Sequence, residues 1–265
     1  MLSAPESTSG VFFGIKPPDI IVLAGRAVLM YYSRRIRNSD HCLLTVDRIP
    51  DLILKQGFSQ GGNIVISIID YDAGNIKSVE KALIKLGQDP VVTRDKDRIL
   101  ASDRVILPGV GAFGDAMKKL NESGLTDVIR EVADRKIPLL GICLGLQLFF
   151  ESSEESPGVE GIGLLKGRIL RIPDGEGLKI PHIGWNSLEL VNGGRLFKGV
   201  GEEPYVYFVH SHYLKADDPN IVKGKTYYGT EIHASVEQDN IFACQFHPEK
   251  SSEVGLKILE NFCRV

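Results

Sequence analysis

The stretch Pro138-Leu139-Leu140-Gly141-Ile142-Cys143-Leu144-Gly145 leads from an apolar run directly into a G-x-C-x-G pattern. The run Pro138 to Ile142 is typical of a strand that is buried on both faces of a parallel sheet. A cysteine between two glycines, where a helix is expected to begin, indicates a nucleophile elbow that holds the thiol above the sheet. Taken alone, the pentapeptide is equally compatible with a buried core cysteine.

The segments upstream of this stretch alternate between short apolar runs and amphipathic stretches. Strands are expected at Ile64 to Asp70, Pro90 to Thr93 and Arg104 to Leu107. The first strand is followed by a helix that buries Ile76, Val79, Leu83 and Leu86 and ends near Gly87. This alternation predicts an α/β fold, with a mostly parallel central sheet, helices on both sides, and ligands bound at the carboxyl ends of the strands.

Downstream of Glu151, glycine and proline become frequent and the apolar runs become shorter. Antiparallel β additions are expected at Leu165 to Arg171, Tyr205 to Val209, Tyr227 to Val236 and Ile241 to Phe246, followed by a terminal helix from Ser252 to Phe262.

Residues 1–62 lack the alternation of the rest, which predicts a domain boundary near Gly62. We expect an N-terminal extension of unknown role over residues 1–62, disordered or poorly packed, and one enzyme domain over residues 63–265. The extension is either a stretch translated from a misassigned start, with a native start near Asn63, or a lineage-specific addition. The first interpretation is preferred.

Composition excludes several classes of function. The chain has a formal charge of −3 with 25% charged residues and no long run of one sign, which argues against nucleic acid and anionic membranes as partners. The apolar stretch Ile20 to Tyr32 is interrupted by Arg26 and is too short to span a bilayer. Four widely separated cysteines (Cys42, Cys143, Cys244, Cys263) indicate a reducing cytoplasm, and no metal site or cofactor is expected.

A histidine and a glutamate follow a strand near the C-terminus, in Phe246-His247-Pro248-Glu249-Lys250. An imidazole at a strand end can take the proton of a thiol and return it to a leaving amine, and Glu249 can orient that imidazole. Cys143, His247 and Glu249 are therefore the candidate catalytic residues. Read in isolation, the segment is more often a surface turn with a solvated Glu-Lys pair.

A glycine-rich loop at another strand end, Pro108-Gly109-Val110-Gly111, supplies the third element. Its backbone N–H groups, together with that of Leu144, can stabilise an oxyanion. Such loops more often mark simple turns or phosphate sites, but no P-loop lysine follows here. The cysteine elbow, the oxyanion loop and the His-x-Glu pair together predict an amide hydrolase.

Over about residues 64–265 the sequence resembles the class I (triad) glutamine amidotransferases, which have a flavodoxin-like fold. Within them it is similar to the glutaminase subunits that serve imidazole glycerol phosphate synthase. The matching motifs are DYDAGN at 70–75, LPGVGAF at 107–113, GICLGLQ at 141–147, PHIGWN at 181–186, YFVHS at 207–211 and QFHPEKS at 245–251.

The resemblance implies a role for each site residue. Cys143 would attack the side-chain amide of L-glutamine, His247 would assist the departure of ammonia, and water would hydrolyse the thioester to glutamate. Gln147 and Ser211 match substrate-binding positions, as does His212. This last residue departs from the family, which usually carries an aromatic residue there, so the pocket wall is expected to differ.

The resemblance also implies a partner. Ammonia would pass to a (β/α)8 cyclase subunit in a heterodimer, yielding imidazole glycerol phosphate and the ribotide AICAR for histidine biosynthesis. Asn75, Trp185 and Lys250 fall on motifs that face this partner. Without the resemblance, Trp185 is expected in the core, as are the histidines His182, His210 and His233.

Two alternatives remain at this point. Another ammonia donor of the same class, serving anthranilate, aminodeoxychorismate or pyridoxal phosphate synthesis, is disfavoured by the segment 181–186. A catalytically silent binding module is disfavoured by the intact set Cys143, His247 and Glu249.

Overall fold

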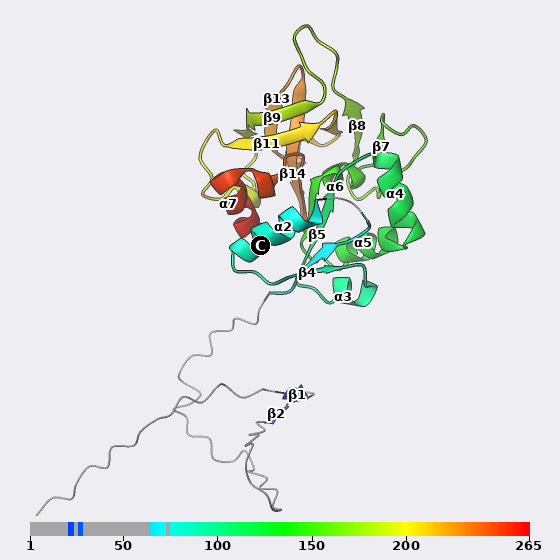
Figure 1. Ribbon diagram of the computed structural model, residues 1–265, viewed down its shortest axis with the longest axis vertical. Coiled ribbons are helices and arrows are strands. Elements are labelled where there is room, and N and C mark those ends of the chain that lie inside the picture. The colour runs from blue at the N-terminus through cyan, green and yellow to red at the C-terminus, as the bar shows by residue number, and fades with distance from the viewer. Residues whose placement is uncertain (1–20, 24–25, 29–63, 73–74) are drawn as a thin grey trace, which may run out of the picture. The chain divides into compact units, whose positions relative to one another are not determined.

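The computed structural model describes residues 21–23, 26–28, 64–72 and 75–265 (Figure 1). The chain divides into two units, Met1–Phe58 and Ser59–Val265. The described residues of the first unit form an antiparallel pair, β1 (Ile21–Leu23) and β2 (Arg26–Val28). The remainder of the predicted extension and its boundary near Gly62 lie outside the described residues. Within the described part of the chain, no helix is long and apolar enough to cross a membrane.

The second unit alternates strands and helices up to α6 and consists mainly of strands after it. The first part contains β3 (Ile66–Ile69), α2 (Ile76–Lys85), β4 (Pro90–Thr93), α3 (Lys96–Leu100), β5 (Arg104–Gly109), α4 (Phe113–Glu122), α5 (Leu125–Asp134), β6 (Leu139–Cys143) and α6 (Leu144–Leu148).

The second part contains short strands and 3-10 turns before a final helix. These elements are β7 (Ser152–Ser153), β8 (Gly167–Arg171), β9 (His182–Ser187), β10 (Glu189–Leu190), η1 (Arg195–Phe197), β11 (Tyr205–His210), β12 (His212–Ala216), η2 (Pro219–Ile221), β13 (Val222–Tyr227), β14 (Glu231–Gln238), β15 (Ile241–Cys244), η3 (Pro248–Lys250) and α7 (Ser252–Phe262).

An eight-stranded sheet in the order β10-β13-β14-β15-β6-β5-β3-β4 lies at the centre of this unit. The strands from β15 to β4 pair in parallel, and those from β10 to β15 pair antiparallel. A two-stranded ribbon of β9 and β11 and a three-stranded sheet of β7, β8 and β12 complete the fold. The predicted fold class, a mostly parallel α/β sheet with antiparallel additions, is confirmed.

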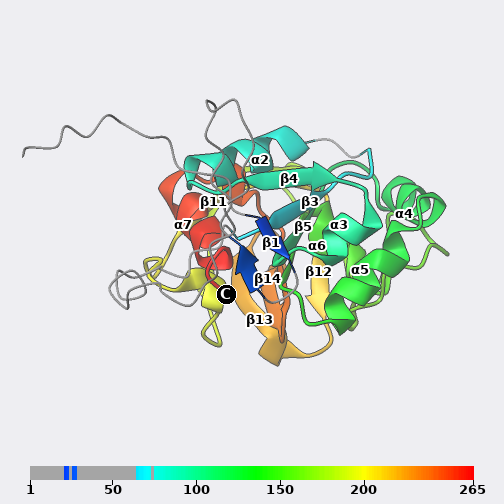
Figure 2. The same ribbon diagram turned by 90° about the horizontal axis from the view of Figure 1, so that it is seen from below.

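The central strands separate two hydrophobic cores. In β5, Val105 and Leu107 face one core while Ile106 faces the other, as the alternation of side chains along a strand requires. Figure 2 shows α2 and α7 on one side of the sheet and α3, α4 and α5 on the other. Because both faces are covered, these strands read as continuous apolar runs in the sequence.

Two of the predicted β segments differ from the structure. The segment Ile241 to Phe246 was expected among the antiparallel additions, but β15 (Ile241–Cys244) pairs in parallel with β6 and antiparallel only with β14. The segment Tyr227 to Val236 was expected to be a single β piece, but β13 ends at Tyr227 and β14 begins at Glu231. The turn between them contains Gly229 with φ 71°, a left-handed conformation that glycine adopts readily. Residues of high β propensity flank that glycine on both sides, so the sequence pattern did not reveal the turn.

Gly255 of the C-terminal helix is packed so tightly that a larger residue there should destabilise the fold. A Cβ atom on Gly255 of α7 would lie 1.9 Å from the carbonyl oxygen of Pro248 in η3. We therefore expect Gly255→Ala to lower the free energy of unfolding by about 2–3 kcal/mol, although alanine favours helices. Gly201→Ala is the control, because a Cβ there meets open space. Urea denaturation with equal midpoints for both variants would contradict this.

Candidate active site

Cys143 occupies the turn between β6 and α6 in an unusual backbone conformation, with φ 55° and ψ −109°. Residues with a side chain rarely adopt positive φ, because Cβ crowds the backbone. The neighbouring glycines make the turn possible. A Cβ on Gly145 would lie 1.9 Å from the Leu107 carbonyl oxygen, and one on Gly141 would lie 2.7 Å from that of Gly145. The backbone thus has the strained turn of a nucleophile elbow.

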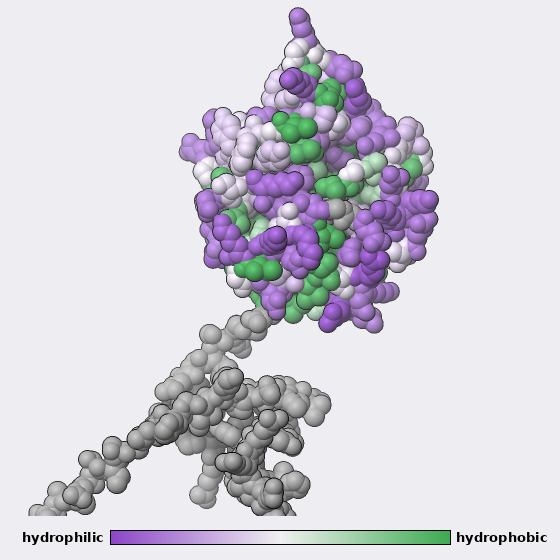
Figure 3. Space-filling model, viewed as in Figure 1, coloured by the Kyte–Doolittle hydropathy of each residue, from purple (hydrophilic) through white to green (hydrophobic). Residues whose placement is uncertain are grey.

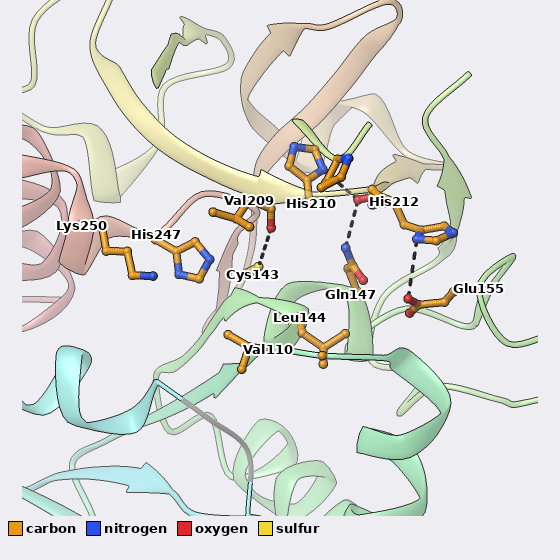
Figure 4. A pocket seen from close by; sticks show the side chains of 13 residues that line it. Val110, Cys143, Leu144, Gln147, Glu155, Val209, His210, His212, His247 and Lys250 are labelled. Atoms are coloured by element: carbon orange, nitrogen blue, oxygen red, sulfur yellow. Dashed lines mark hydrogen bonds and ion pairs between the residues drawn. The ribbon is translucent and has the colours of Figure 1, made fainter. Parts of the chain in front are cut away.

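The imidazole of His247 faces the sulfur of Cys143 (Figure 4). Its Nδ1 atom lies 2.8 Å from Glu249 Oε1, and both side chains are buried. Burial alone lowers the pKa of His247, but the hydrogen bonds and charges of Cys143 and Glu249 outweigh it and raise the pKa to about 9. The site therefore favours an imidazolium between a sulfur and a carboxylate.

The turn that carries His247 is held to β11 by a closed set of hydrogen bonds. The His247 N–H donates to the Tyr207 carbonyl oxygen at 2.9 Å. The Tyr207 N–H donates to Ser251 Oγ at 2.9 Å, and the Ser251 hydroxyl donates to the His247 carbonyl oxygen at 2.6 Å. Ser251 is fully buried, so these bonds are protected from water. They fix the position from which the imidazole reaches the sulfur.

A cavity of about 300 Å³ opens beside the sulfur. Nine of the residues singled out from the sequence line it, namely Val110, Gly111, Cys143, Leu144, Gln147, Ser211, His212, His247 and Lys250. Gly109 is at the end of β5, where it is paired with Cys143 of β6. Glu249 is connected to the cavity through His247.

One wall of the cavity is built from amide groups. Gln147 Nε2 donates to the His212 carbonyl oxygen and to Gln245 Oε1, both at 3.0 Å. Gln245 Nε2 in turn lies 3.7 Å from the sulfur of Cys143. Both N–H groups of Gln147 are therefore in use, and its Oε1 atom is left for a ligand.

Glu155 also lines the cavity, and the sequence analysis did not single it out. Its Oε2 atom accepts a hydrogen bond from the Phe113 N–H at 2.7 Å, and its Oε1 atom lies 3.9 Å from His212 Nδ1. In the sequence it is one of several glutamates after Glu151, with no pattern to distinguish it. Its position depends on contacts with α4 that only the fold provides.

The three residues assigned to a partner surface lie in different surroundings. Asn75 Nδ2 donates to Glu249 Oε1 at 2.5 Å, so Asn75 contacts the His247–Glu249 pair directly. Lys250 lines the cavity. Trp185 is 52% exposed on β9, which excludes the core position considered as an alternative.

His182, His210 and His233 are buried, as expected, although His233 Nε2 lies 3.6 Å from Glu231 Oε1. His182 and His210 are nevertheless hydrogen-bonded to each other at 3.0 Å, and His210 lines the cavity. Among the described residues, no group of three or more histidines, cysteines or acidic residues is arranged to hold a metal ion.

Comparison with known proteins is consistent with this arrangement. The family described as glutamine amidotransferase class-I matches residues 67–265. A protein named imidazole glycerol phosphate synthase subunit HisH from Methanocaldococcus jannaschii is 48% identical over 198 residues, 75% of this chain and 98% of the relative. Its namesake from Moorella thermoacetica is 51% identical over 197 residues, covering 74% and 93%. The solved structure of PurLQS from Thermotoga maritima shares the fold, with a TM-score of 0.61 at 22% identity, covering 76% of this chain and 98% of that one.

The surroundings of His247 predict how it titrates. The hydrogen bonds and charges of Cys143 and Glu249 stabilise the imidazolium of His247, so removal of either partner should lower the pKa of His247 and release its proton at lower pH. We expect His247 in the unchanged protein to titrate near pH 9, and in Cys143→Ala and Glu249→Gln at clearly lower pH. NMR titration of the imidazole signals measures this. His233, which lies elsewhere in the sheet, should be unaffected, and a wild-type His247 midpoint at about 6.5 would refute the expectation.

Proposed function

We propose a role for each part of the site from one premise, that this chain belongs to the class I glutamine amidotransferases and, within them, to the HisH subunits of imidazole glycerol phosphate synthase. It is a glutamine amidotransferase of histidine biosynthesis. Residues 63–265 constitute its amidotransferase domain. It hydrolyses L-glutamine to L-glutamate and ammonia, and the ammonia is delivered to a second subunit.

The observation that carries this proposal is the approach of His247 to Cys143 at a strained turn beside an open cavity. In the proposed reaction the sulfur of Cys143 attacks the side-chain amide carbon of glutamine. His247 then donates its proton to the departing ammonia, leaving a glutamyl thioester. Glu249 keeps the imidazole oriented and stabilises its positive charge. Water, activated by the neutral His247, hydrolyses the thioester and regenerates the thiol.

The negative oxygen that develops during attack requires hydrogen-bond donors. Leu144 is the first residue of α6, so its N–H has no acceptor within the helix, and Leu144 lines the cavity. The backbone of Gly109, Val110 and Gly111 runs alongside, and Gly111 has φ 98°, a conformation that suits glycine. We assign the oxyanion hole to these four residues.

Glutamine itself is an amino acid with one positive and one negative end. Gln147, Ser211 and His212 form the polar wall that receives it, since they line the cavity next to the sulfur. Glu155 adds a carboxylate at the same cavity, and we assign it to the α-ammonium group. The volume of about 300 Å³ is sufficient for one small amino acid.

The second subunit is a (β/α)8 cyclase, with which this chain forms a heterodimer. It uses the ammonia to form imidazole glycerol phosphate and AICAR. The relatives are named as subunits of imidazole glycerol phosphate synthase. In this chain, residues 67–265 match the glutamine amidotransferase family. Three buried cysteines of the described chain, Cys143, Cys244 and Cys263, are unpaired thiols, in keeping with a reducing cytoplasm. The proposed chemistry uses no cofactor.

The docking surface lies on the outer face of the β9–β11 ribbon, together with Asn75 and Lys250. Ile183, Trp185 and Tyr205 are each more than half exposed on this ribbon. Trp185 packs edge-on against Tyr207, its cross-strand neighbour, with ring centroids 6.0 Å apart. Figure 3 shows hydrophobic surface on this side of the molecule. Exposed aromatic groups of this kind are typical of protein interfaces.

Separate nitrogen sources test the role of Cys143. We expect Cys143→Ala to abolish synthesis from glutamine in the reconstituted complex, because no thioester can form. Synthesis with added ammonium should remain within about twofold of wild type, because ammonia bypasses the glutaminase. The rate of product formation is measured with each source. Equal loss with both sources would show that Cys143 has a structural role instead.

Truncation of the exposed tryptophan tests the docking surface. Truncation of a central aromatic residue of an interface commonly costs about 2 kcal/mol of binding free energy, which corresponds to an increase of about 30-fold in Kd. We expect Trp185→Ala to weaken binding of the cyclase subunit by about this factor in calorimetric titration. Val65→Ala is the matched control, since Val65 is exposed just before β3 of the central sheet, outside the β9–β11 ribbon. Unchanged affinity in Trp185→Ala would place the interface elsewhere.

A further inference from the structure

A chain of hydrogen bonds runs from β9 to the nucleophile. His182 Nδ1 lies 3.0 Å from His210 Nε2, and His210 Nδ1 lies 2.9 Å from the His212 carbonyl oxygen. That same oxygen accepts the bond from Gln147, which continues through Gln245 toward the sulfur of Cys143. Figure 4 shows the hydrogen bonds that meet at the His212 carbonyl oxygen. Nothing in the proposed reaction uses His182 or His210.

The direction of every bond in the chain can be assigned. A carbonyl oxygen only accepts, so His210 Nδ1 must carry a proton. Burial lowers the pKa of His210 to about 3 and that of His182 to about 4, so both imidazoles are neutral at working pH. A neutral imidazole has a single N–H, which leaves His210 Nε2 as an acceptor. His182 must therefore donate through Nδ1, and its own Nε2 is unprotonated.

The outer end of this chain is held by stacking. The His182 ring lies between the rings of Phe208 and Tyr228, with centroids 4.8 Å and 3.9 Å away and nearly parallel planes. His182 is also the cross-strand partner of His210 in the β9–β11 ribbon. The donor nitrogen of His182 consequently has little freedom to move away from His210.

The inner end of the chain is the wall of the glutamine cavity. The His212 carbonyl oxygen has two lone pairs, and His210 and Gln147 occupy both. If His182 no longer donates, His210 Nε2 becomes a buried acceptor without a partner. A change of tautomer offers no relief, because it would leave a buried Nε2–H without an acceptor and turn an unprotonated Nδ1 toward the His212 oxygen. The His210 ring is instead held at Nδ1 alone, and it can tilt toward another donor at the expense of its bond to the His212 oxygen. The peptide of Ser211 and His212 would then shift, and Gln147 with it.

We propose that His182 and His210 are positioning residues of the glutaminase, two neutral imidazoles in series that fix the Ser211–His212 peptide and Gln147 in the geometry that receives glutamine. This inference rests on the proposed function, because it refines how that same cavity binds its substrate. The interaction is made in the bound ground state and in the transition state alike. Its loss should therefore raise KM for glutamine and leave kcat nearly unchanged.

Two substitutions of His182 separate the hydrogen bond from the packing. His182→Phe keeps a flat ring between Phe208 and Tyr228 but cannot donate. His182→Asn loses the ring but places an N–H donor near the former position of Nδ1. We expect a rise of about tenfold in KM for His182→Phe, the size of one lost hydrogen bond, and a KM within about twofold of wild type for His182→Asn. Glutamate release is assayed in the complex with saturating cyclase subunit.

His233→Phe is the matched control, because His233 is also buried and accepts a bond from the Ala216 N–H at 3.1 Å, but does not line the cavity. It should leave KM unchanged. A KM that follows the ring rather than the donor, so that His182→Asn is impaired and His182→Phe is not, overturns the proposal. Equal KM values in all variants, or a loss confined to kcat, overturn it as well.

A second measurement does not depend on catalysis. Nitrogen-15 NMR distinguishes histidine tautomers, and we expect His182 and His210 both to carry their proton on Nδ1 near neutral pH. Protonation of either ring on Nε2 refutes the chain of bonds even if the enzyme is active. If the wild-type complex released no glutamate, the proposed function would be refuted instead. The tautomers of His182 and His210 would still show whether the chain of hydrogen bonds exists.

Discussion

The close approach of two backbone segments beneath Cys143 is the constraint on which the rest of the site depends. Gly145 lies so close to the Leu107 carbonyl oxygen that no side chain fits between them. This contact draws the start of α6 against β5 and forces Cys143 into a positive φ. Backbone strain of this kind persists only where surrounding packing enforces it, and here both faces of the sheet are covered by helices. The hydrophobic cores thus hold the thiol above the strand ends.

Burial then determines the electrostatics of the partners. The side chains of Glu249 and His247 are removed from water, and burial of this kind disfavours the charged form of an isolated group. Here the two groups lie 2.8 Å apart, so that each offsets the desolvation of the other. Asn75 adds a second donor to the same carboxylate oxygen. Farther along the cavity, burial has the opposite effect on His182 and His210, since no carboxylate among the described residues contacts them and their pKa values fall. Histidines within one small region therefore differ in charge because of their neighbours, not because of depth alone.

The sequence predicted the parallel core well, because strands covered on both faces must be continuously apolar, and the predicted run Pro138 to Ile142 forms most of β6, in which every residue is buried. It predicted less after Glu151, where β9 and β12 carry mixed residues and the Gly229 turn is hidden between residues that favour strands. Cys143 and His247 were identifiable because their motifs depend on local chain geometry. Glu155 and the bond from Asn75 to Glu249 were not, since these contacts join residues 42 and 174 positions apart in the chain.

The position of β11 connects the outer surface to the chemistry. Its Tyr207 packs against the exposed Trp185, while the backbone of Tyr207 binds the turn of His247. Two residues later, the Val209 carbonyl oxygen lies 3.7 Å from the sulfur of Cys143, and the next residue, His210, is hydrogen-bonded to the His212 carbonyl oxygen in the cavity wall. A protein that docks on the outer face of this strand therefore contacts the element that positions both His247 and the cavity beside Cys143. Any displacement of β11 on docking changes the site without a separate signalling segment, because backbone bonds of a single strand join the two surfaces.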